Sequence, residues 1–154
     1  MPTKSSSRYF VSTDQRRLDH QVIRDFLRSS YWAKGRSPRA ISKSIENSFC
    51  FAVYQGEEQV AFARVITDFA VFAYLADVFV LSEHRGRGVA QKMIGAILGH
   101  PRLRKIKVFQ LATRDAHQLY AKFGFKPLAD PERQMKRIRP GLIKVQSNQK
   151  AKQR

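Results

Sequence analysis

The sequence predicts a single α/β domain, built on one mixed central sheet of about six to seven strands with helices on both faces. Three observations predict it. Segments rich in aromatic and β-branched residues alternate with segments whose apolar residues recur at helical spacing. The 154 residues suit one domain, and 43% of them are hydrophobic, which is enough for a core. The chain shows no internal repeat and no second domain.

The first third of the chain predicts one strand and two helices. A short strand covers 9–13, and a helix follows whose apolar face is formed by Leu18, Val22, Ile23, Phe26 and Leu27. Ser37 and Pro38 indicate the N-cap and first residue of a second helix, because a hydroxyl accepts well at the cap and proline is preorganised after it. Residues 31–36 then form the loop between the two helices.

Three strands come next in the prediction. Residues 49–54 and 59–67 read as a hairpin around the polar turn 55–58, which contains a glycine. Residues 71–80 form an almost uninterrupted apolar run, typical of a strand that is covered on both faces. Asp77 is the exception in this run.

The remainder predicts alternating helices and strands. A helix covers 88–99 and a strand 106–112, and Asp115 is placed to cap a helix that ends at Phe123 and Gly124. Two closing strands are expected, one from Phe125 onward and one over 134–139. The order is strand, two helices, three strands, helix, strand, helix and strands.

The charge of the chain predicts an anionic partner. Lysine and arginine number 29 against 12 acidic residues, so the formal net charge is +17. Part of this charge is terminal, because 134–154 holds seven basic residues and no acidic one. We expect a domain over 8–139, with basic, disordered termini at 1–7 and 146–154. Such a tail either keeps the protein soluble or binds a polyanion such as RNA.

Several classes of protein are disfavoured by composition. Cys50 is the single cysteine, so no intrachain disulfide can form, and no cysteine and histidine set has zinc spacing. We therefore expect no metal site. No apolar segment is long enough for a membrane span or an export signal, which favours a cytoplasmic protein without membrane contact. The sequence leaves the oligomeric state open, a dimer included.

The most informative motif is the glycine turn between the strand at 71–80 and the helix at 88–99. Gly86 and Gly88 have no side chains, Arg85 and Arg87 add positive charge, and the helix presents unpaired N–H groups. A diphosphate suits such a turn, although a simple chain reversal would also use glycine. A P-loop is excluded because the G-K-[ST] that it requires is absent. A dinucleotide-binding fingerprint is excluded because it requires a glycine or alanine where Gln91 stands.

A second segment makes the interpretation of the glycine turn more specific. Arg85-x-x-Gly88-x-Ala90 resembles the acetyl-CoA motif of the GNAT acetyltransferase superfamily, and Ala116-x-x-Leu119-Tyr120-x-x-Phe123-Gly124-Phe125 resembles that family's later motif. The resemblance covers about 9–139 and implies a GNAT fold that uses acetyl-CoA as co-substrate. Where the family usually has asparagine, seven residues before the tyrosine, this chain has Thr113, which alters the expected polar contact.

The resemblance also assigns residues. It implies that backbone groups of Phe79, Val80 and Leu81 pair with the pantetheine arm. It further implies that the diphosphate is held by the amides of Arg85, Gly86, Arg87, Gly88, Val89, Ala90 and Gln91. Thr113 and Tyr120 complete the cofactor-binding residues, with the Tyr120 phenol near the sulfur. Tyr120 would protonate the departing thiolate, since a phenol can serve as a general acid in a cleft. The alternative is that Tyr120 packs in the core.

A base is needed because an alkyl amine is mostly protonated at neutral pH. Asp77 and Glu83 are the candidates, beside a water chain. Asp77 is equally compatible with a buried carboxylate satisfied by Arg64 or a backbone amide, and Glu83 with a solvated or paired side chain. Trp32, Arg36, Phe72 and Tyr74 are candidates for the acceptor side.

The expected activity is transfer of an acetyl group to a primary amine of a small molecule, protein or peptide by direct attack in a ternary complex. The alternatives are a basic nucleic-acid-associated protein with a vestigial acetyl-CoA site, and an acetyltransferase acting on an RNA-bound substrate. Both give the +17 charge a role.

Overall fold

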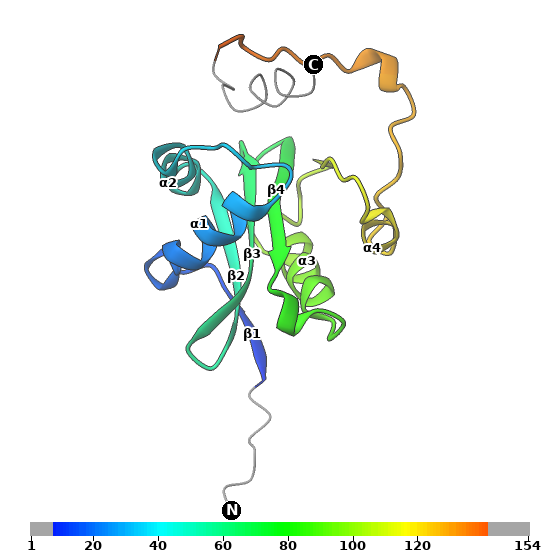
Figure 1. Ribbon diagram of the computed structural model, residues 1–154. Coiled ribbons are helices and arrows are strands. Elements are labelled where there is room, and N and C mark those ends of the chain that lie inside the picture. The colour runs from blue at the N-terminus through cyan, green and yellow to red at the C-terminus, as the bar shows by residue number, and fades with distance from the viewer. Residues whose placement is uncertain (1–7, 142–154) are drawn as a thin grey trace, which may run out of the picture.

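The computed structural model describes residues 8–141 and places its strands in one sheet (Figure 1). In spatial order these are β1 (Tyr9–Ser12), β2 (Phe49–Gln55), β3 (Glu58–Thr67), β4 (Phe72–Val80) and β5 (Val108–Gln110). Neighbours from β1 to β4 are antiparallel, whereas β4 and β5 are parallel. The predicted mixed α/β sheet is therefore confirmed.

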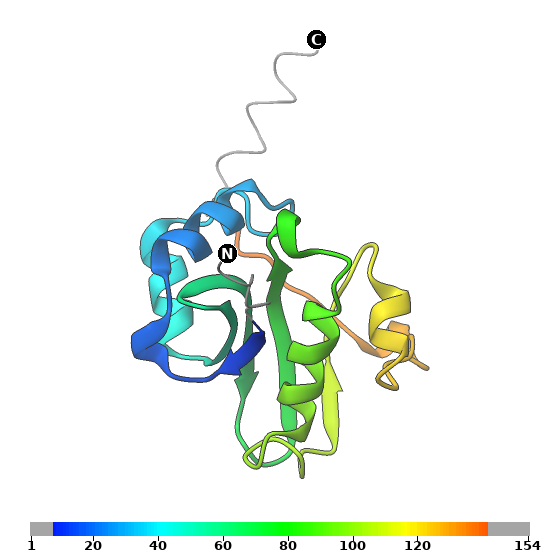
Figure 2. The ribbon, with the colours of Figure 1, turned by 90° about the horizontal axis from the view of Figure 1, so that it is seen from below.

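Helices cover both faces of this sheet (Figures 1 and 2). On one face lie α1 (His20–Ser29) and α2 (Pro38–Glu46), whose Ile23, Leu27, Ile41 and Ile45 pack against the sheet. On the other lies α3 (Val89–Gly99), which contributes Val89, Met93, Ile94 and Ile97 to a second core. Beyond β5, a short α4 (His117–Ala121) adds the buried Tyr120 to that core. Short 3-10 turns occupy Gln15–Arg17, Ser82–His84 and Pro131–Arg133.

The helix ends follow local chemistry. Asp19 caps α1 by accepting from the backbone N–H groups of Gln21 and Val22, each at 3.1 Å. Ser37 caps α2 by accepting from Ala40 N–H at 3.1 Å, with Pro38 as its first residue, as predicted. The expected cap at Asp115 is wrong, because Ala116 occupies that position and Thr113 Oγ1 accepts from its N–H.

The predicted closing strands are the main error. In the described part of the chain no strand follows Phe125, so the sheet has five strands rather than six to seven. Pro127 and Pro131 cannot donate to a ladder, which disfavours a continuous strand. Met135 and Ile138 are three residues apart and 97% and 62% exposed, so they form no apolar face of period two. The expectations for 1–7 and 146–154 lie outside the described residues.

β4 and β5 separate along their length, and this separation positions the site. Their ladder joins Phe72, Ala73 and Tyr74 to Val108, Phe109 and Gln110. Beyond Tyr74, β4 continues to Val80 with β3 as its ladder partner. Within residues 8–141 the opposite edge of β4, from 75 to 80, is left without a strand partner. Free N–H and C=O groups on such an edge can pair with an extended ligand.

Candidate active site

The glycine turn joins the end of β4 to α3. Gly86 and Gly88 have φ of +74° and +76°, a left-handed region that residues with a side chain rarely adopt. Gly88 is the N-cap of α3 and has no side chain to bond the first N–H groups of the helix. Those donors and the positive end of the helix dipole therefore remain available to an anion, as the sequence predicts.

A cavity of about 210 Å³ lies against this turn and is here called the turn cavity. Arg85 is fixed beside it, because its Nε donates to the carbonyl oxygen of Val80 at 3.0 Å. The residues that line the cavity are Val80, His84, Arg85, Gly86, Gly88, Val89, Ala90, Gln91 and Leu119. Most of the residues that sequence reasoning assigned to the diphosphate are thus brought together.

His84 and Tyr9 are a part of this region that the sequence did not reveal. His84 is buried, and the Tyr9 hydroxyl lies 2.8 Å from its Nδ1. Arg87 Nη1 donates to the same hydroxyl at 3.5 Å. Tyr9, Arg87 and Lys92 line a second cavity of about 450 Å³, here called the basic cavity, which adjoins the turn cavity at Gly88 and Val89.

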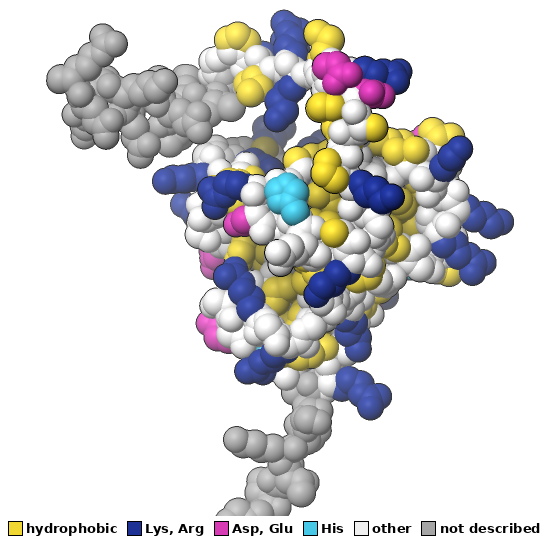
Figure 3. Space-filling model, turned by 90° about the vertical axis from the view of Figure 1, so that its right-hand side faces the viewer, with side chains coloured by type: hydrophobic (Ala, Val, Ile, Leu, Met, Phe, Trp, Pro, Cys, Tyr) yellow, Lys and Arg dark blue, Asp and Glu magenta, His cyan; other side chains and the backbone are white. Residues whose placement is uncertain are grey.

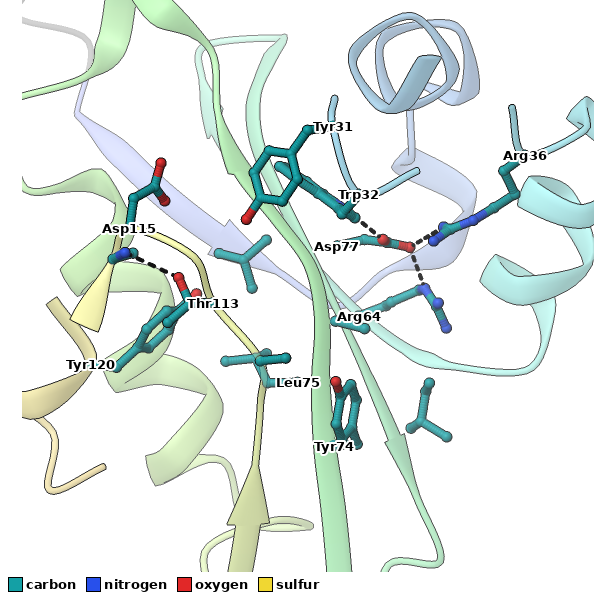
Figure 4. Close-up of a pocket in the computed structure, with 15 residues that line it drawn as sticks. Tyr31, Trp32, Arg36, Arg64, Tyr74, Leu75, Asp77, Thr113, Asp115 and Tyr120 are labelled. Carbon is teal, nitrogen blue, oxygen red and sulfur yellow. Dashed lines mark hydrogen bonds and ion pairs between the residues drawn. The ribbon is translucent and has the colours of Figure 1, made fainter. Parts of the chain in front are cut away.

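Farther along β4, three donors converge on Asp77 (Figure 4). Trp32 Nε1 donates to Oδ1 at 2.9 Å, Arg36 Nη1 to Oδ2 at 2.7 Å and Arg64 Nε to Oδ2 at 2.6 Å. The Arg64 contact is the one that sequence reasoning offered as the alternative to a catalytic role. Asp77 thereby ties the loop between α1 and α2 to the middle of the sheet.

The backbone at Asp77 explains its position. The register between β3 and β4 shifts from Phe62 opposite Phe79 to Arg64 opposite Ala76, so β4 carries one additional residue. Asp77 lies in this bulge with φ of +52°. A bulge re-aims side chains, and here it directs a carboxylate toward two arginines in the middle of an apolar strand.

The protonation state of Asp77 follows from these contacts. Burial acts to raise the pKa of the carboxyl and is the largest single influence. Hydrogen bonds from Arg36 and Arg64, together with their charges, outweigh burial and hold the pKa below its usual value. Asp77 is therefore a poor proton acceptor near neutral pH.

A third cavity, of about 310 Å³, lies where β4 and β5 separate and is here called the tyrosine cavity. Trp32, Arg36, Arg64 and Asp77 border one side, while Thr113, Asp115 and Tyr120 border the other, with Tyr31 and Leu75 between them (Figure 4). Tyr74 and Ala76 also line it. Arg114 lies over the ring of Tyr31 at 3.7 Å and so connects the two sides of the cavity.

Tyr120 is held at this cavity by its ring. It is 8% exposed and packs edge-on against Phe125, with ring centroids 5.8 Å apart. Burial raises the pKa of its phenol to about 12, with a smaller contribution from Tyr31. The phenol therefore keeps its proton at neutral pH. Tyr120 both packs in the core and reaches the cavity, so the two sequence interpretations are compatible.

Other candidates lie elsewhere. Phe72, at the start of β4, is 39% exposed and does not line the tyrosine cavity, whereas Trp32, Arg36 and Tyr74 do. Glu83 is exposed in the 3-10 turn and lines neither the turn cavity nor the tyrosine cavity. The Phe79 side chain is buried on the α1 face, stacked on Phe26 with centroids 4.0 Å apart, and its backbone lies opposite Phe62 in the β3–β4 ladder.

Three further properties of the described residues concern metal ions, the single cysteine and the membrane. Among residues 8–141, no group of three or more histidine, cysteine, aspartate or glutamate side chains is placed to hold a metal ion. Cys50 is 1% exposed, and burial raises the pKa of its thiol to about 12, which fits small core filling rather than a nucleophile. In the same range, no helix is long and apolar enough to cross a membrane.

Comparison with solved structures supports the fold. A crystal structure from Xanthomonas campestris pv. campestris is 45% identical, with a TM-score of 0.84, and the match covers 90% of this chain and 98% of that one. The structure of glucosamine-6-phosphate N-acetyltransferase from Arabidopsis thaliana is 13% identical, with a TM-score of 0.59 over 85% and 98% of the two chains, and shares the fold.

Sequence comparison supports the family. A curated protein of Gibberella zeae is 33% identical over an alignment of 138 residues, and the match covers 74% of this chain and 76% of that protein. That protein and the Xanthomonas one are both described as putative acetyltransferases, the latter of the GNAT family. The model of the acetyltransferase (GNAT) domain matches residues 46–127. The chain belongs to the GNAT acetyltransferase family, whose members are acyltransferases and generally use acetyl-CoA.

Proposed function

We propose that this chain transfers an acetyl group from acetyl-CoA to a primary amine. One observation carries the proposal: the turn cavity and the tyrosine cavity lie along the same unpaired edge of β4. Val80 lines the first and Ala76 to Val78 line the second, so roughly 7 to 13 Å of strand joins the phosphate-binding turn to the tyrosine cavity. This layout suits a long co-substrate with an anionic end and a reactive end.

The residues present fit acetyl-CoA. The N–H groups of Val89, Ala90 and Gln91 at the start of α3 are available to the diphosphate, and Arg85 lies beside them. Arg8, Arg87 and Lys92 in the basic cavity would neutralise a further phosphate. Of the three residues assigned to the pantetheine arm, Val80 would pair with it on the open edge of β4. Phe79 lies opposite Phe62 in the β3–β4 ladder, and both backbone groups of Leu81 are already bonded, its N–H to Val60 O at 2.8 Å and its C=O to His84 N–H at 2.9 Å.

The co-substrate supplies an activated thioester, and the chain supplies a proton donor. Tyr120 Oη holds its proton at neutral pH because burial raises the pKa of the phenol to about 12. Its position at the tyrosine cavity lets it donate to the departing thiolate. Thr113 contributes less than an asparagine would, because its hydroxyl already accepts from Ala116 N–H at 3.0 Å.

The acceptor enters from the side of Trp32 and Tyr74. Both side chains line the tyrosine cavity together with Asp115. The Asp115 carboxylate is 72% exposed, lies 3.9 Å from Arg114 Nη2, and is open to a cationic acceptor. Asp77 holds Trp32 and Arg36 in place rather than serving as base, since two arginines keep its pKa low. The amine then loses its proton to solvent through the open cavity, which is the water route left open by the sequence.

A nucleic-acid-associated protein is the second candidate, and the net charge of +17 favours it. In that case the site around Tyr120 would be vestigial, or the amine acceptor would be bound to RNA. Acetyl-CoA binding and turnover separate these cases, because a vestigial site gives no turnover with any amine.

The test is a panel of primary amines assayed for release of coenzyme A, with the Tyr120→Phe variant as the probe. Loss of the proton donor should lower kcat by about 100-fold or more, while the Kd for acetyl-CoA stays within about twofold. Tyr54→Phe is the matched control: Tyr54 is a buried tyrosine whose hydroxyl donates to Arg17 O at 2.8 Å, and it lines none of the three cavities described above. Turnover by Tyr120→Phe equal to that of Tyr54→Phe would remove Tyr120 from the mechanism.

A further inference from the structure

The tyrosine cavity holds positive charge that proton donation by Tyr120 does not use. Arg36 and Arg64 line the cavity, and both contact the carboxylate of Asp77. Two guanidinium groups share one carboxylate, so this side of the cavity keeps one positive charge in excess. The Asp77 side chain is 2% exposed, whereas those of Arg36 and Arg64 are 25% and 11% exposed. The positive groups are therefore the ones that a molecule in the cavity meets.

Both arginines have N–H donors that remain unused within the described residues. A guanidinium has several such donors in one plane. Arg36 gives one of them to Asp77, while Arg64 gives one to Asp77 and one to the Ser48 hydroxyl at 3.1 Å. These contacts fix the direction of each planar group but leave it further donors. An oxyanion in the cavity can therefore bind guanidinium groups that are already oriented.

Tyr74 adds a hydroxyl to the same side of the cavity. In the β3–β4 ladder Ile66 lies opposite Tyr74 and Arg64 opposite Ala76, so Tyr74 and Arg64 are diagonal neighbours on one face of the sheet. Tyr74 also lines the cavity (Figure 4), and within residues 8–141 its hydroxyl has no hydrogen-bond partner. Arg36, Arg64 and Tyr74 are here called the arginine subsite.

The other side of the cavity carries negative charge. Asp115 lines it together with Tyr120, and Figure 4 shows both residues on the side away from the arginine subsite. The contact between Asp115 and Arg114 is long, at 3.9 Å, and both side chains are exposed, so solvent weakens it. The uncharged side chains of Tyr31 and Leu75 lie between the two sides. The cavity therefore suits a molecule with an anionic end and a cationic end.

We propose that the acceptor is a small amino acid, bound through its carboxylate at the arginine subsite with its amine directed toward Tyr120. This inference rests on the proposed acetyl transfer and names the class of amine that the transfer uses. One excess positive charge matches a singly charged carboxylate better than a doubly charged phosphate ester. The cavity volume of about 310 Å³ is at the lower end for small-molecule sites, which suits an acceptor of amino-acid size.

The carboxylate anchors the acceptor and takes no part in the bond changes. The ammonium group first loses one proton to solvent. Its nitrogen then bonds to the acetyl carbon, the carbon–sulfur bond breaks, and the sulfur takes the proton of Tyr120. A second proton leaves the nitrogen and restores the phenol through solvent, so the products are an N-acetyl amino acid and coenzyme A. Anchoring lowers the barrier because it holds the amine near the thioester.

Matched acceptors test the proposal on the wild-type chain. Amino acids from glycine to γ-aminobutyrate are each compared with their carboxamides, which keep the amine and the size but have no negative charge. O-Phosphoethanolamine tests a phosphate in place of the carboxylate. Coenzyme A release should give the preferred amino acid a kcat/KM, per unprotonated amine, at least about tenfold above its amide and the phosphate compound. An amide or phosphate used equally well would overturn the proposal and leave acetyl transfer intact.

Arg36→Gln separates binding of the carboxylate from support of the α1–α2 loop. The variant should lower kcat/KM for the preferred amino acid at least about tenfold more than for its amide. Arg36→Lys keeps the charge and should recover part of this difference. Arg39→Gln is the matched control, because Arg39 is exposed on α2 and does not line the tyrosine cavity. Equal losses for the amino acid and its amide would mean that Arg36 only holds the loop, which contradicts the subsite.

Binding without turnover distinguishes failure of the subsite from failure of the proposed function. If no amine releases coenzyme A, acetyl transfer is contradicted, but the subsite is still measurable by equilibrium dialysis of radiolabelled amino acids, with and without coenzyme A. Wild type should bind the preferred amino acid with a Kd at least about tenfold lower than that of Arg36→Gln, while Arg39→Gln matches wild type. Absence of binding to wild type, or equal Kd values for wild type and Arg36→Gln, would overturn the proposal.

Discussion

Asp77 combines an unfavourable backbone with favourable side-chain contacts. Phe69 and Asp77 are the non-glycine residues with positive φ in the described range. Left-handed backbone costs a residue with a side chain about 1 kcal/mol, so the surroundings must hold Asp77 there. Its three hydrogen bonds to Trp32, Arg36 and Arg64 are the contacts that do so. The residue therefore fixes the bulge of β4 and the α1–α2 loop together.

Asp77→Asn should therefore destabilise the protein. The substitution keeps the shape but leaves Arg64, whose side chain is 11% exposed, without its carboxylate, and loss of one partner of a buried pair costs about 3 kcal/mol. Urea unfolding at pH 7 measures the loss. Asp14→Asn, which removes an exposed carboxylate from the Asp14–Arg16 pair, is the control and should change the midpoint little.

The difference in unfolding free energy between wild type and Asp77→Asn should change with pH in a defined direction. Because the folded-state pKa of Asp77 is lowered, its charge stabilises the fold above the unfolded value near 3.8, and this contribution disappears as the pH falls through the folded-state pKa. Wild type and Asp77→Asn should therefore converge in stability at acid pH. The acid limb of kcat/KM should keep its midpoint in the variant, whereas loss of that limb would identify Asp77 as the base after all.

At the scale of elements, the junction of β4 and α3 is an anion site that depends on backbone shape. An added Cβ at Gly88 would meet no atom within 4 Å, so glycine is required there for its φ of +76° rather than for space. The same holds at Gly56 in the β2–β3 turn, where φ is +61°. The two glycines form a matched pair of test positions, because Gly88 lines the turn cavity and Gly56 does not.

Gly88→Ala and Gly56→Ala should each lower stability by about 1 kcal/mol. Only Gly88→Ala should weaken the binding of acetyl-CoA, with a Kd about tenfold higher, because a shifted turn redirects the first N–H groups of α3 away from the diphosphate. Isothermal titration calorimetry with acetyl-CoA measures the affinities, and thermal unfolding measures the stabilities. Equal affinities for the two variants would mean that the turn only reverses the chain.

Local signals in the sequence were sufficient for most elements. Ser37-Pro38 located α2, the glycine turn located the start of α3, and the apolar run located β4, because each signal acts within a few residues. The prediction of the closing strands failed for a local reason. Residues 125–139 contain few strand-forming side chains, and Pro127 and Pro131 interrupt the segment, so its local signals disfavour a ladder.

The candidate site was predictable where it is contiguous in sequence. The turn and Tyr120 were found by their motifs, whereas Tyr9 was missed because its contact with His84 spans 75 positions. Tyr31 and Asp115 were missed as lining residues of one cavity for the same reason, since they lie 84 positions apart. Asp77 was recognised as unusual, but its role depends on Arg36, which is 41 residues away.

At the scale of the whole molecule, the charge far exceeds what one co-substrate needs. The glycine turn and basic cavity use few of the 29 lysine and arginine residues, and they are offset by only 12 acidic residues. Basic side chains are distributed over the face shown in Figure 3 rather than gathered at one cavity. Such a distribution favours a second, larger anionic partner, for which RNA is the simplest candidate.

Binding of single-stranded RNA should therefore weaken steeply with salt, since each phosphate contact releases counterions. Ending the chain at 141 removes four basic residues and no acidic one, so the formal charge falls from +17 to +13. If those four residues contact phosphates, the slope of log K against log salt should become shallower by up to about 3, with little change in acetyl-CoA affinity. Fluorescence anisotropy at 50 to about 300 mM NaCl measures both slopes. An unchanged slope would assign RNA binding to residues 1–141. If RNA does not bind at 50 mM NaCl, the positive charge serves coenzyme A binding and solubility instead.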